Sequence, residues 1–204
     1  MDVSQLWEDI KSRQLLMVDV RSLKVYSAAH VPGAVNVPYG GLQGWAQELA
    51  QWLGQVDMPF CLFADDAELG SAALLALETH GKSPAAVWDQ GTGAWEAEGG
   101  PIVSVVDIGV DDLKENLDRY VVVDVREPIE WRTGTIPGAI KIPLGQLPEK
   151  WESLDAGREY AVVCAHGNRS LRGASFLADQ GFEAGSVVGG MASWSDAGHP
   201  VEHD

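Results

Sequence analysis

The feature that most constrains this chain is an internal repeat. The segment Met17-Val18-Asp19-Val20-Arg21 returns as residues 122–126, and residues 31–35 return as 136–140, both at an offset of 105 residues. Toward the end of each copy a tryptophan precedes a proline by six residues, at Trp95 and at Trp194. Landmarks that recur in the same order indicate two copies of one domain. We therefore predict domains at residues 1–103 and 104–204, joined through the Gly- and Pro-containing segment 98–101.

Each copy alternates short apolar runs with segments of helical periodicity. The expected strands are residues 15–20, 60–64 and 87–88 in the first copy and 120–125, 160–164 and 186–188 in the second. The expected helices are residues 45–53, 67–80, 112–117 and 169–180, with Ser4 and Asp111 as candidate N-caps. Strands that alternate with helices predict an α/β fold. We expect each domain to hold a mostly parallel sheet flanked by helices.

The charge and cysteine content exclude several classes of function. The chain has 204 residues and a formal net charge of −16, which repels phosphate backbones and anionic membranes, so we expect neither nucleic acid nor membrane as a partner. No apolar stretch is long enough to span a bilayer, and residues 1–5 do not resemble a signal peptide. Two cysteines exclude a disulfide framework and a four-cysteine zinc site. We expect a cytoplasmic protein without metal or cofactor.

One segment of the second copy carries the pattern of a reactive site. The apolar run 160–163 leads directly into Cys164-Ala165-His166-Gly167-Asn168-Arg169-Ser170, and a helical pattern follows. A cysteine at the carboxyl end of a strand lies where α/β sheets bind ligands. Gly167 permits a tight turn, so that backbone amides can surround the sulfur, and the helix N-terminus and Arg169 favour the thiolate. The segment therefore predicts a nucleophile in an anion cradle.

Several polar residues near this segment have more than one interpretation. His166 is either a general base or a loop residue that contributes only its backbone. Arg172 follows Arg169 by one turn and is expected to be a solvated surface residue. Cys61 lies inside a strand and is interpreted as a small buried apolar residue.

The first copy lacks the expected nucleophile. Residues 60–64 align with residues 160–164, so Ala64 takes the place of Cys164. Asp65, Asp66 and Glu68 follow and would repel an anion. We expect the first domain to be inactive and to serve by packing against the second.

The second copy resembles the rhodanese homology domain. The resemblance lies in the block 124–139, in the loop 164–170 and in the closing block 189–201, which together span nearly the whole copy. The first copy matches the outer blocks through Asp19-Val20-Arg21, residues 30–34 and Trp95. The whole chain is thus similar to tandem-domain sulfurtransferases of the thiosulfate sulfurtransferase type. Glu130 stands near a position where thiosulfate-using tandem relatives often have an arginine.

The resemblance implies a two-step sulfur transfer. Cys164 takes a sulfane sulfur from thiosulfate, mercaptopyruvate or a persulfide, and a cyanide, thiol or protein acceptor removes it. The backbone amides of Ala165, His166, Gly167, Asn168, Arg169 and Ser170 bind the persulfide in this scheme. The alternatives are a non-enzymatic persulfide relay between proteins, a scaffold module, and a phosphatase or arsenate reductase. Four residues between Cys164 and Arg169, rather than five, count against the last of these.

Overall fold

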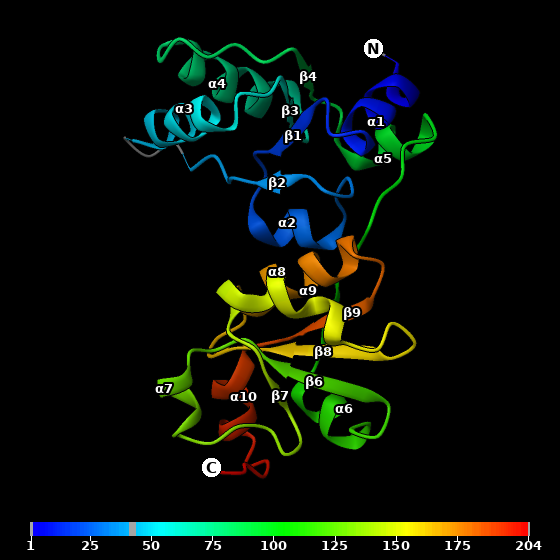
Figure 1. The fold of residues 1–204 in the computed structure, drawn as a ribbon, viewed down its shortest axis with the longest axis vertical. Coiled ribbons are helices and arrows are strands. Elements are labelled where there is room, and N and C mark those ends of the chain that lie inside the picture. The colour runs from blue at the N-terminus through cyan, green and yellow to red at the C-terminus, as the bar shows by residue number, and fades with distance from the viewer. Residues whose placement is uncertain (1, 41–43, 204) are drawn as a thin grey trace. The chain divides into compact units, whose positions relative to one another are not determined.

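The structure, a computed structural model, describes residues 2–40 and 44–203 (Figure 1). The chain divides into two compact units, residues 1–103 and 104–204. Met1 and Asp204, the outer limits of the two domains expected from the sequence, lie outside the described residues.

The first unit contains a four-stranded parallel sheet of order β2-β1-β3-β4. Its elements are α1 (Val3–Lys11), β1 (Leu16–Asp19), α2 (Leu23–Ala28), β2 (Val35–Asn36), α3 (Trp45–Val56), β3 (Phe60–Phe63), α4 (Ala67–Glu78), β4 (Ala86–Trp88) and α5 (Gly91–Ala97). One face packs against α1 and α5 through Leu6 and Trp95, and the other against α3 and α4 through Leu53 and Leu77. Burial of both faces explains why the strand sequences are apolar runs without alternation.

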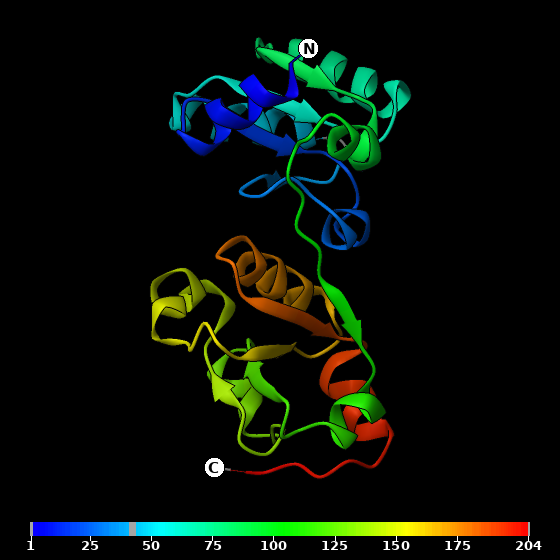
Figure 2. The same ribbon diagram turned by 90° about the vertical axis from the view of Figure 1, so that its right-hand side faces the viewer.

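The second unit repeats this plan with one additional strand. Its elements are β5 (Val106–Ile108), α6 (Val110–Glu115), β6 (Tyr120–Asp124), α7 (Pro128–Trp131), β7 (Ile140–Lys141), η1 (Leu144–Gln146), α8 (Leu147–Lys150), η2 (Trp151–Ser153), β8 (Glu159–Val163), α9 (Asn168–Asp179), β9 (Glu183–Val187) and α10 (Gly190–Asp196). The parallel sheet has the order β5-β9-β8-β6-β7. Helix α9 covers one face, and α6 and α10 cover the other (Figure 2). The predicted α/β fold, with a parallel sheet and flanking helices in each domain, is confirmed.

Two predicted helix caps are wrong. Helix α1 begins at Val3, and the N-cap is Asp2, whose carboxylate accepts a hydrogen bond from the backbone N–H of Ser4 at 3.0 Å. Helix α6 begins at Val110, so Asp111 lies in its first turn, where its carboxylate contacts His199 Nε2 at 2.9 Å. In both cases the apolar face extends to the first residue of the helix, through Val3 and Val110, so the helix begins before the polar residue that was expected to cap it.

The order of β8 in the sheet places the candidate loop. Strand β8 lies between β9 and β6, and all three strands run in the same direction. The loop that follows β8 is therefore flanked by the segments that follow its two neighbouring strands. Among the described residues, no helix is both long and apolar enough to cross a membrane.

Candidate active site

Cys164 lies directly after β8, at the carboxyl end of a central strand. Its residue surface is 1% exposed. The chain turns back at Gly167, which has a φ of +104° and forms the N-cap of the twelve-residue helix α9. A side chain at this φ would be strained, so glycine is required for the turn that brings the start of α9 to the sulfur.

Hydrogen bonds of the loop converge on the Cys164 sulfur. The backbone N–H of Gly167 donates to Sγ at 3.1 Å, and the Ser170 hydroxyl lies 3.6 Å from Sγ. Burial by itself would raise the pKa of the Cys164 thiol. The Ser170 hydroxyl and the backbone amides of Ser170, Gly167 and His166 outweigh burial, and the pKa is lowered. The site therefore stabilises a sulfur anion through preorganised donors.

The first residues of α10 hold the loop through backbone hydrogen bonds. The backbone N–H of Met191 donates to the carbonyl oxygen of Cys164 at 2.7 Å, and that of Ala192 donates to the carbonyl oxygen of Ala165 at 3.0 Å. A Cβ at Gly190 would lie 2.2 Å from the Cys164 carbonyl oxygen. This supporting role does not follow from local sequence spacing, although the pair Gly189-Gly190 in the closing block marks the close approach.

Arg169 is held by a carboxylate from the neighbouring loop. Its two terminal nitrogens donate to the Glu130 oxygens at 2.6 and 2.7 Å, and Glu130 in turn accepts from the backbone N–H of Glu127 at 2.9 Å. The hydrogen bonds from Arg169 are the main reason that the pKa of Glu130 falls to about 2. The positive charge expected to act from Arg169 is thus largely compensated by Glu130, and the loop donors are the larger contributions that favour the thiolate.

The remaining loop residues contribute differently. The side chains of His166 and Asn168 are exposed, whereas Ala165 is half-buried. The backbone N–H of His166 is among the groups that lower the pKa of the Cys164 thiol. Of the two interpretations of His166, this geometry favours the one in which the backbone acts.

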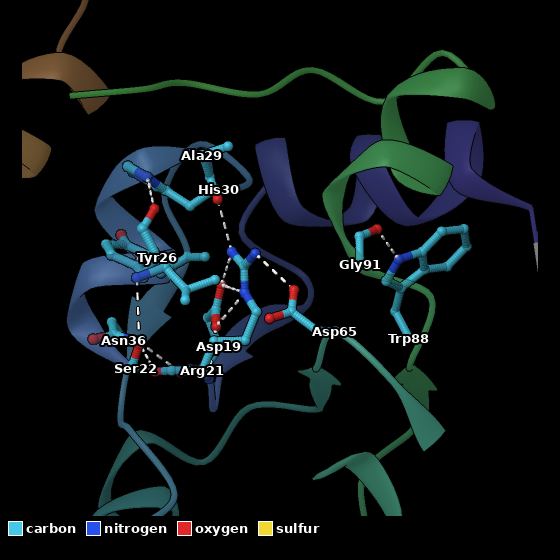
Figure 3. A network of polar contacts seen from close by, with 12 residues as sticks. Asp19, Arg21, Ser22, Tyr26, Ala29, His30, Asn36, Asp65, Trp88 and Gly91 are labelled. Carbon is cyan, nitrogen blue, oxygen red and sulfur yellow. Dashed lines mark hydrogen bonds and ion pairs between the residues drawn. The ribbon is translucent and has the colours of Figure 1, made fainter. Parts of the chain in front are cut away.

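In the corresponding loop of the first domain, the acidic side chains bind residues of the same domain. Arg21 is ion-paired with Asp19 at 2.6 Å and with the Asp65 carboxylate at 3.2 Å, and it also donates to the carbonyl oxygen of Ala29 (Figure 3). Asp66 accepts from the backbone N–H of Leu69 and caps α4. Two of the three carboxylates that follow Ala64 are therefore engaged within their own domain.

Cys61 is separated from this loop and is fully buried in β3. Burial raises the pKa of its thiol to about 12. At neutral pH it remains a protonated thiol, which agrees with its interpretation as a small apolar residue.

Several known proteins are similar to this chain in sequence or in fold. A Bacillus subtilis protein named "Putative sulfurtransferase YtwF" is 37% identical over 101 residues, which are 48% of this chain and 98% of that protein. The protein named "Thiosulfate sulfurtransferase GlpE" from Stutzerimonas stutzeri is 36% identical over 87 residues, which are 41% of this chain and 79% of that protein. A crystal structure of thiosulfate sulfurtransferase from Pseudomonas aeruginosa is similar over 98% of this chain and 43% of its own length, with a TM-score of 0.51 and 24% identity, which is a likeness of fold.

The family match covers both halves of the chain. The model of the rhodanese-like domain matches residues 2–98 and again residues 109–197. The parallel sheets, the repeated landmarks and this double match agree, and the chain therefore belongs to the rhodanese family, with two rhodanese-like domains in tandem.

Proposed function

We propose that this protein is a sulfurtransferase in which Cys164 accepts a sulfane sulfur as a persulfide and passes it to a thiophilic acceptor. The observation that carries the proposal is the Cys164 sulfur surrounded by donors from His166, Gly167 and Ser170 at the carboxyl end of β8. Relatives named as sulfurtransferases support the same assignment. The first domain, with Ala64 in place of the nucleophile, takes no part in the chemistry.

The transfer consists of two displacements at sulfur. In the first, the Cys164 thiolate attacks the sulfane sulfur of a donor, the new S–S bond forms, and the donor leaves with the electron pair of its own broken bond. With thiosulfate the leaving group is sulfite. In the second, the acceptor attacks the outer sulfur and the Cys164 thiolate leaves, which with cyanide gives thiocyanate. No net oxidation of the protein occurs, and the loop donors stabilise the anion before and after each step.

The charge around the loop affects which sulfur donor the site prefers. Glu130 compensates Arg169, so the site offers backbone amides and a helix N-terminus to the incoming sulfur rather than a free guanidinium. Such a site favours donors with little negative charge. Among thiosulfate, mercaptopyruvate and a persulfide, we therefore propose the thiosulfate dianion as the least favoured donor, with a thiol, cyanide or a protein as acceptor.

Intact-mass measurement tests the central assignment. The wild-type chain, mixed separately with thiosulfate, mercaptopyruvate and a low-molecular-weight persulfide, should gain the mass of one sulfur atom from at least one donor and lose it on addition of cyanide. Cys164→Ser should gain none, because a hydroxyl of similar size cannot form a persulfide. Cys61→Ser is the matched control and should load as the wild type does.

Two results would contradict this function. One is a wild-type chain that takes sulfur from none of the three donors, and the other is a folded Cys164→Ser variant that still loads. A persulfide that forms but transfers only to a protein thiol, and not to cyanide, would instead indicate a relay between proteins.

A further inference from the structure

A buried serine of β9 contacts the hydroxyl that faces the Cys164 sulfur. The Ser186 Oγ lies 2.8 Å from the Ser170 Oγ, and Ser170 is in turn 3.6 Å from the Cys164 Sγ. The two serines are 3% and 0% exposed. Ser186 pairs in register with Val162 of β8 on one side and with Asp107 of β5 on the other. A buried hydroxyl at such a position is costly unless it is hydrogen-bonded.

Either hydroxyl can be the donor in the contact between Ser186 and Ser170, and the acceptors around Ser170 favour Ser186 in that role. The Ser186 hydroxyl needs an acceptor, and Ser170 Oγ is the partner that the structure gives it. A hydroxyl has one proton and two lone pairs. If Ser186 donates to Ser170, the Ser170 proton is left for the carbonyl oxygen of Gly167, at 2.9 Å, or for the sulfur of Cys164. When the sulfur is negatively charged, it is the stronger acceptor, and the Ser170 proton turns to it.

The first domain provides an internal comparison for this arrangement. Val87 pairs in register with Leu62 of β3, as Ser186 does with Val162 of β8. A Cβ at Gly70 would lie 3.3 Å from Val87 Cγ1 and 3.7 Å from Ala64 Cβ. The same three positions therefore meet in both domains. Where the nucleophile is Cys164 they hold two serines, and where it is replaced by Ala64 they hold glycine and valine.

We propose that Ser186 is a positioning residue for the sulfur-transfer site: it donates to Ser170 and thereby directs the Ser170 hydroxyl toward the Cys164 sulfur anion. This inference rests on the proposed function of Cys164. In the domain that lacks the nucleophile, the corresponding space is lined by Val87, Ala64 and the Cβ atom of Asp89, so packing alone does not require a hydroxyl at position 186. The pair of buried serines is explained by the charge that the sulfur carries.

Other titratable groups near the sulfur are accounted for by their own partners. His166 belongs to the loop and its side chain is exposed, whereas Arg169 of α9 is paired with Glu130 of α7. Glu127 precedes α7, and Arg126, which follows β6, is paired with Asp124. Among the described residues, the carboxyl end of β9 and the start of α10 bring only uncharged side chains. Asp107 of β5 pairs in register with Ser186 and is exposed. None of these groups is substituted in a Ser186 variant, so a change in Cys164 ionisation there reports on the serine pair.

The ultraviolet absorbance of the thiolate, followed against pH, tests the inference directly. Below pH 9 this signal comes from Cys164, since burial raises the pKa of Cys61 to about 12. In Ser186→Ala the titration of Cys164 should move to higher pH. The rate of persulfide formation at neutral pH should fall roughly three- to tenfold, the scale of one neutral hydrogen bond. In a Ser170→Ala background, the further loss of Ser186 should change neither quantity.

Matched variants separate this role from a structural one. Ser186→Thr keeps the hydroxyl and Ser186→Val has the same shape without it, so Thr should retain the wild-type titration and Val should not. Tyr160→Phe removes a hydroxyl at the opposite end of β8, where it donates to the carbonyl oxygen of Asp155, and should leave the titration and the persulfide rate unchanged. Circular dichroism checks the fold of each variant.

The outcomes discriminate between the two proposals. If folded Ser186→Ala titrates as the wild type, or if the effects of the Ser170 and Ser186 substitutions add, Ser186 does not act through Ser170 and the inference is wrong. The titration does not depend on sulfur transfer. A wild-type chain that loads no sulfur therefore overturns the proposed function while leaving the result on Ser186 to be judged by its own measurement.

Discussion

At the scale of single residues, the site depends on how each charge is compensated. The Cys164 sulfur is stabilised by neutral donors, whereas the guanidinium nearest to the loop is bound by Glu130. This division has a physical reason. Neutral donors fixed by the backbone need no reorganisation when the sulfur becomes charged, while a free guanidinium would be solvated and mobile.

The Arg169–Glu130 pair predicts two effects of opposite sign. Glu130→Gln should leave the Arg169 charge uncompensated and should speed sulfur uptake from thiosulfate. Arg169→Ala should leave an unpaired carboxylate beside the loop and should slow it. Each effect should be roughly three- to tenfold, the scale of one partly screened charge. Single-turnover loading followed by intact mass measures both.

The pH range of this prediction follows from the pKa of Glu130. Because Arg169 lowers that pKa to about 2, the carboxylate is ionised through mild acid, and the stabilising pair is lost only as the pH falls toward 2. Both effects should therefore be constant between about pH 5 and pH 8. An effect that disappears within this range would show that the pair is not formed in solution.

At the scale of elements, the site consists of a strand end, a loop and two helix N-termini. Helix α9 begins at the loop and directs backbone donors to the sulfur, and α10 begins behind it and binds the carbonyl oxygens of Cys164 and Ala165. The loop is thus held on both sides by backbone hydrogen bonds.

Gly190→Ala should dislodge the loop. The residue has a φ of +60°, and a Cβ there would lie 2.2 Å from the Cys164 carbonyl oxygen, so the variant combines backbone strain with an overlap that the loop must relieve by moving. Gly198→Ala is the control, because its φ is +72° and its Cβ would meet open space. Strain alone should cost about 1–2 kcal/mol.

Two measurements distinguish these glycine variants. Denaturant unfolding measures the free energy of unfolding. In Gly198→Ala this free energy should fall only by the cost of backbone strain, and the variant should keep full sulfur loading. Gly190→Ala should lose more stability and most of its loading. Equal losses in the two variants would mean that α10 does not support the loop.

The first-domain loop should not become a second site when a thiol is restored. In the double variant Ala64→Cys with Cys164→Ser, the new sulfur would meet Gly70 in place of Ser170 and Val87 in place of Ser186. Asp65 and Asp66 are engaged with Arg21 and α4, and their charges oppose an anion. Intact mass should show no persulfide at position 64. A stable persulfide there would show that the acidic loop can serve as a cradle.

At the scale of the whole molecule, the net charge of −16 opposes anionic donors at long range. Added salt shortens the screening length to about 10 Å at 0.1 M and should reduce this repulsion, while the hydrogen bonds at Cys164 are short and are screened less. Loading from thiosulfate at low concentration should therefore rise with moderate salt. Loading from a persulfide donor of lower net charge than thiosulfate, measured in parallel, should change less, and an equal rise would mean that salt acts on the protein instead.

The sequence by itself determined the repeat, the two parallel α/β domains and the loop around Cys164. Buried parallel strands need continuous apolar runs, and a strand–loop–helix junction needs a glycine at its turn, so these features are local and can be recognised in the chain. The loss of the nucleophile at Ala64 is equally visible, because aligned copies place it opposite Cys164.

Only the tertiary structure decided which side chains meet at the sulfur. Glu130 reaches Arg169 across 39 positions of sequence, and Ser186 reaches Ser170 from a neighbouring strand, so neither contact follows from local spacing. The same holds for Gly190, whose closeness to the Cys164 carbonyl oxygen depends on how α10 packs behind the loop. Parallel strand order brings distant segments to one edge of the sheet, and the partner of each polar group is set there, where burial makes an unsatisfied group costly.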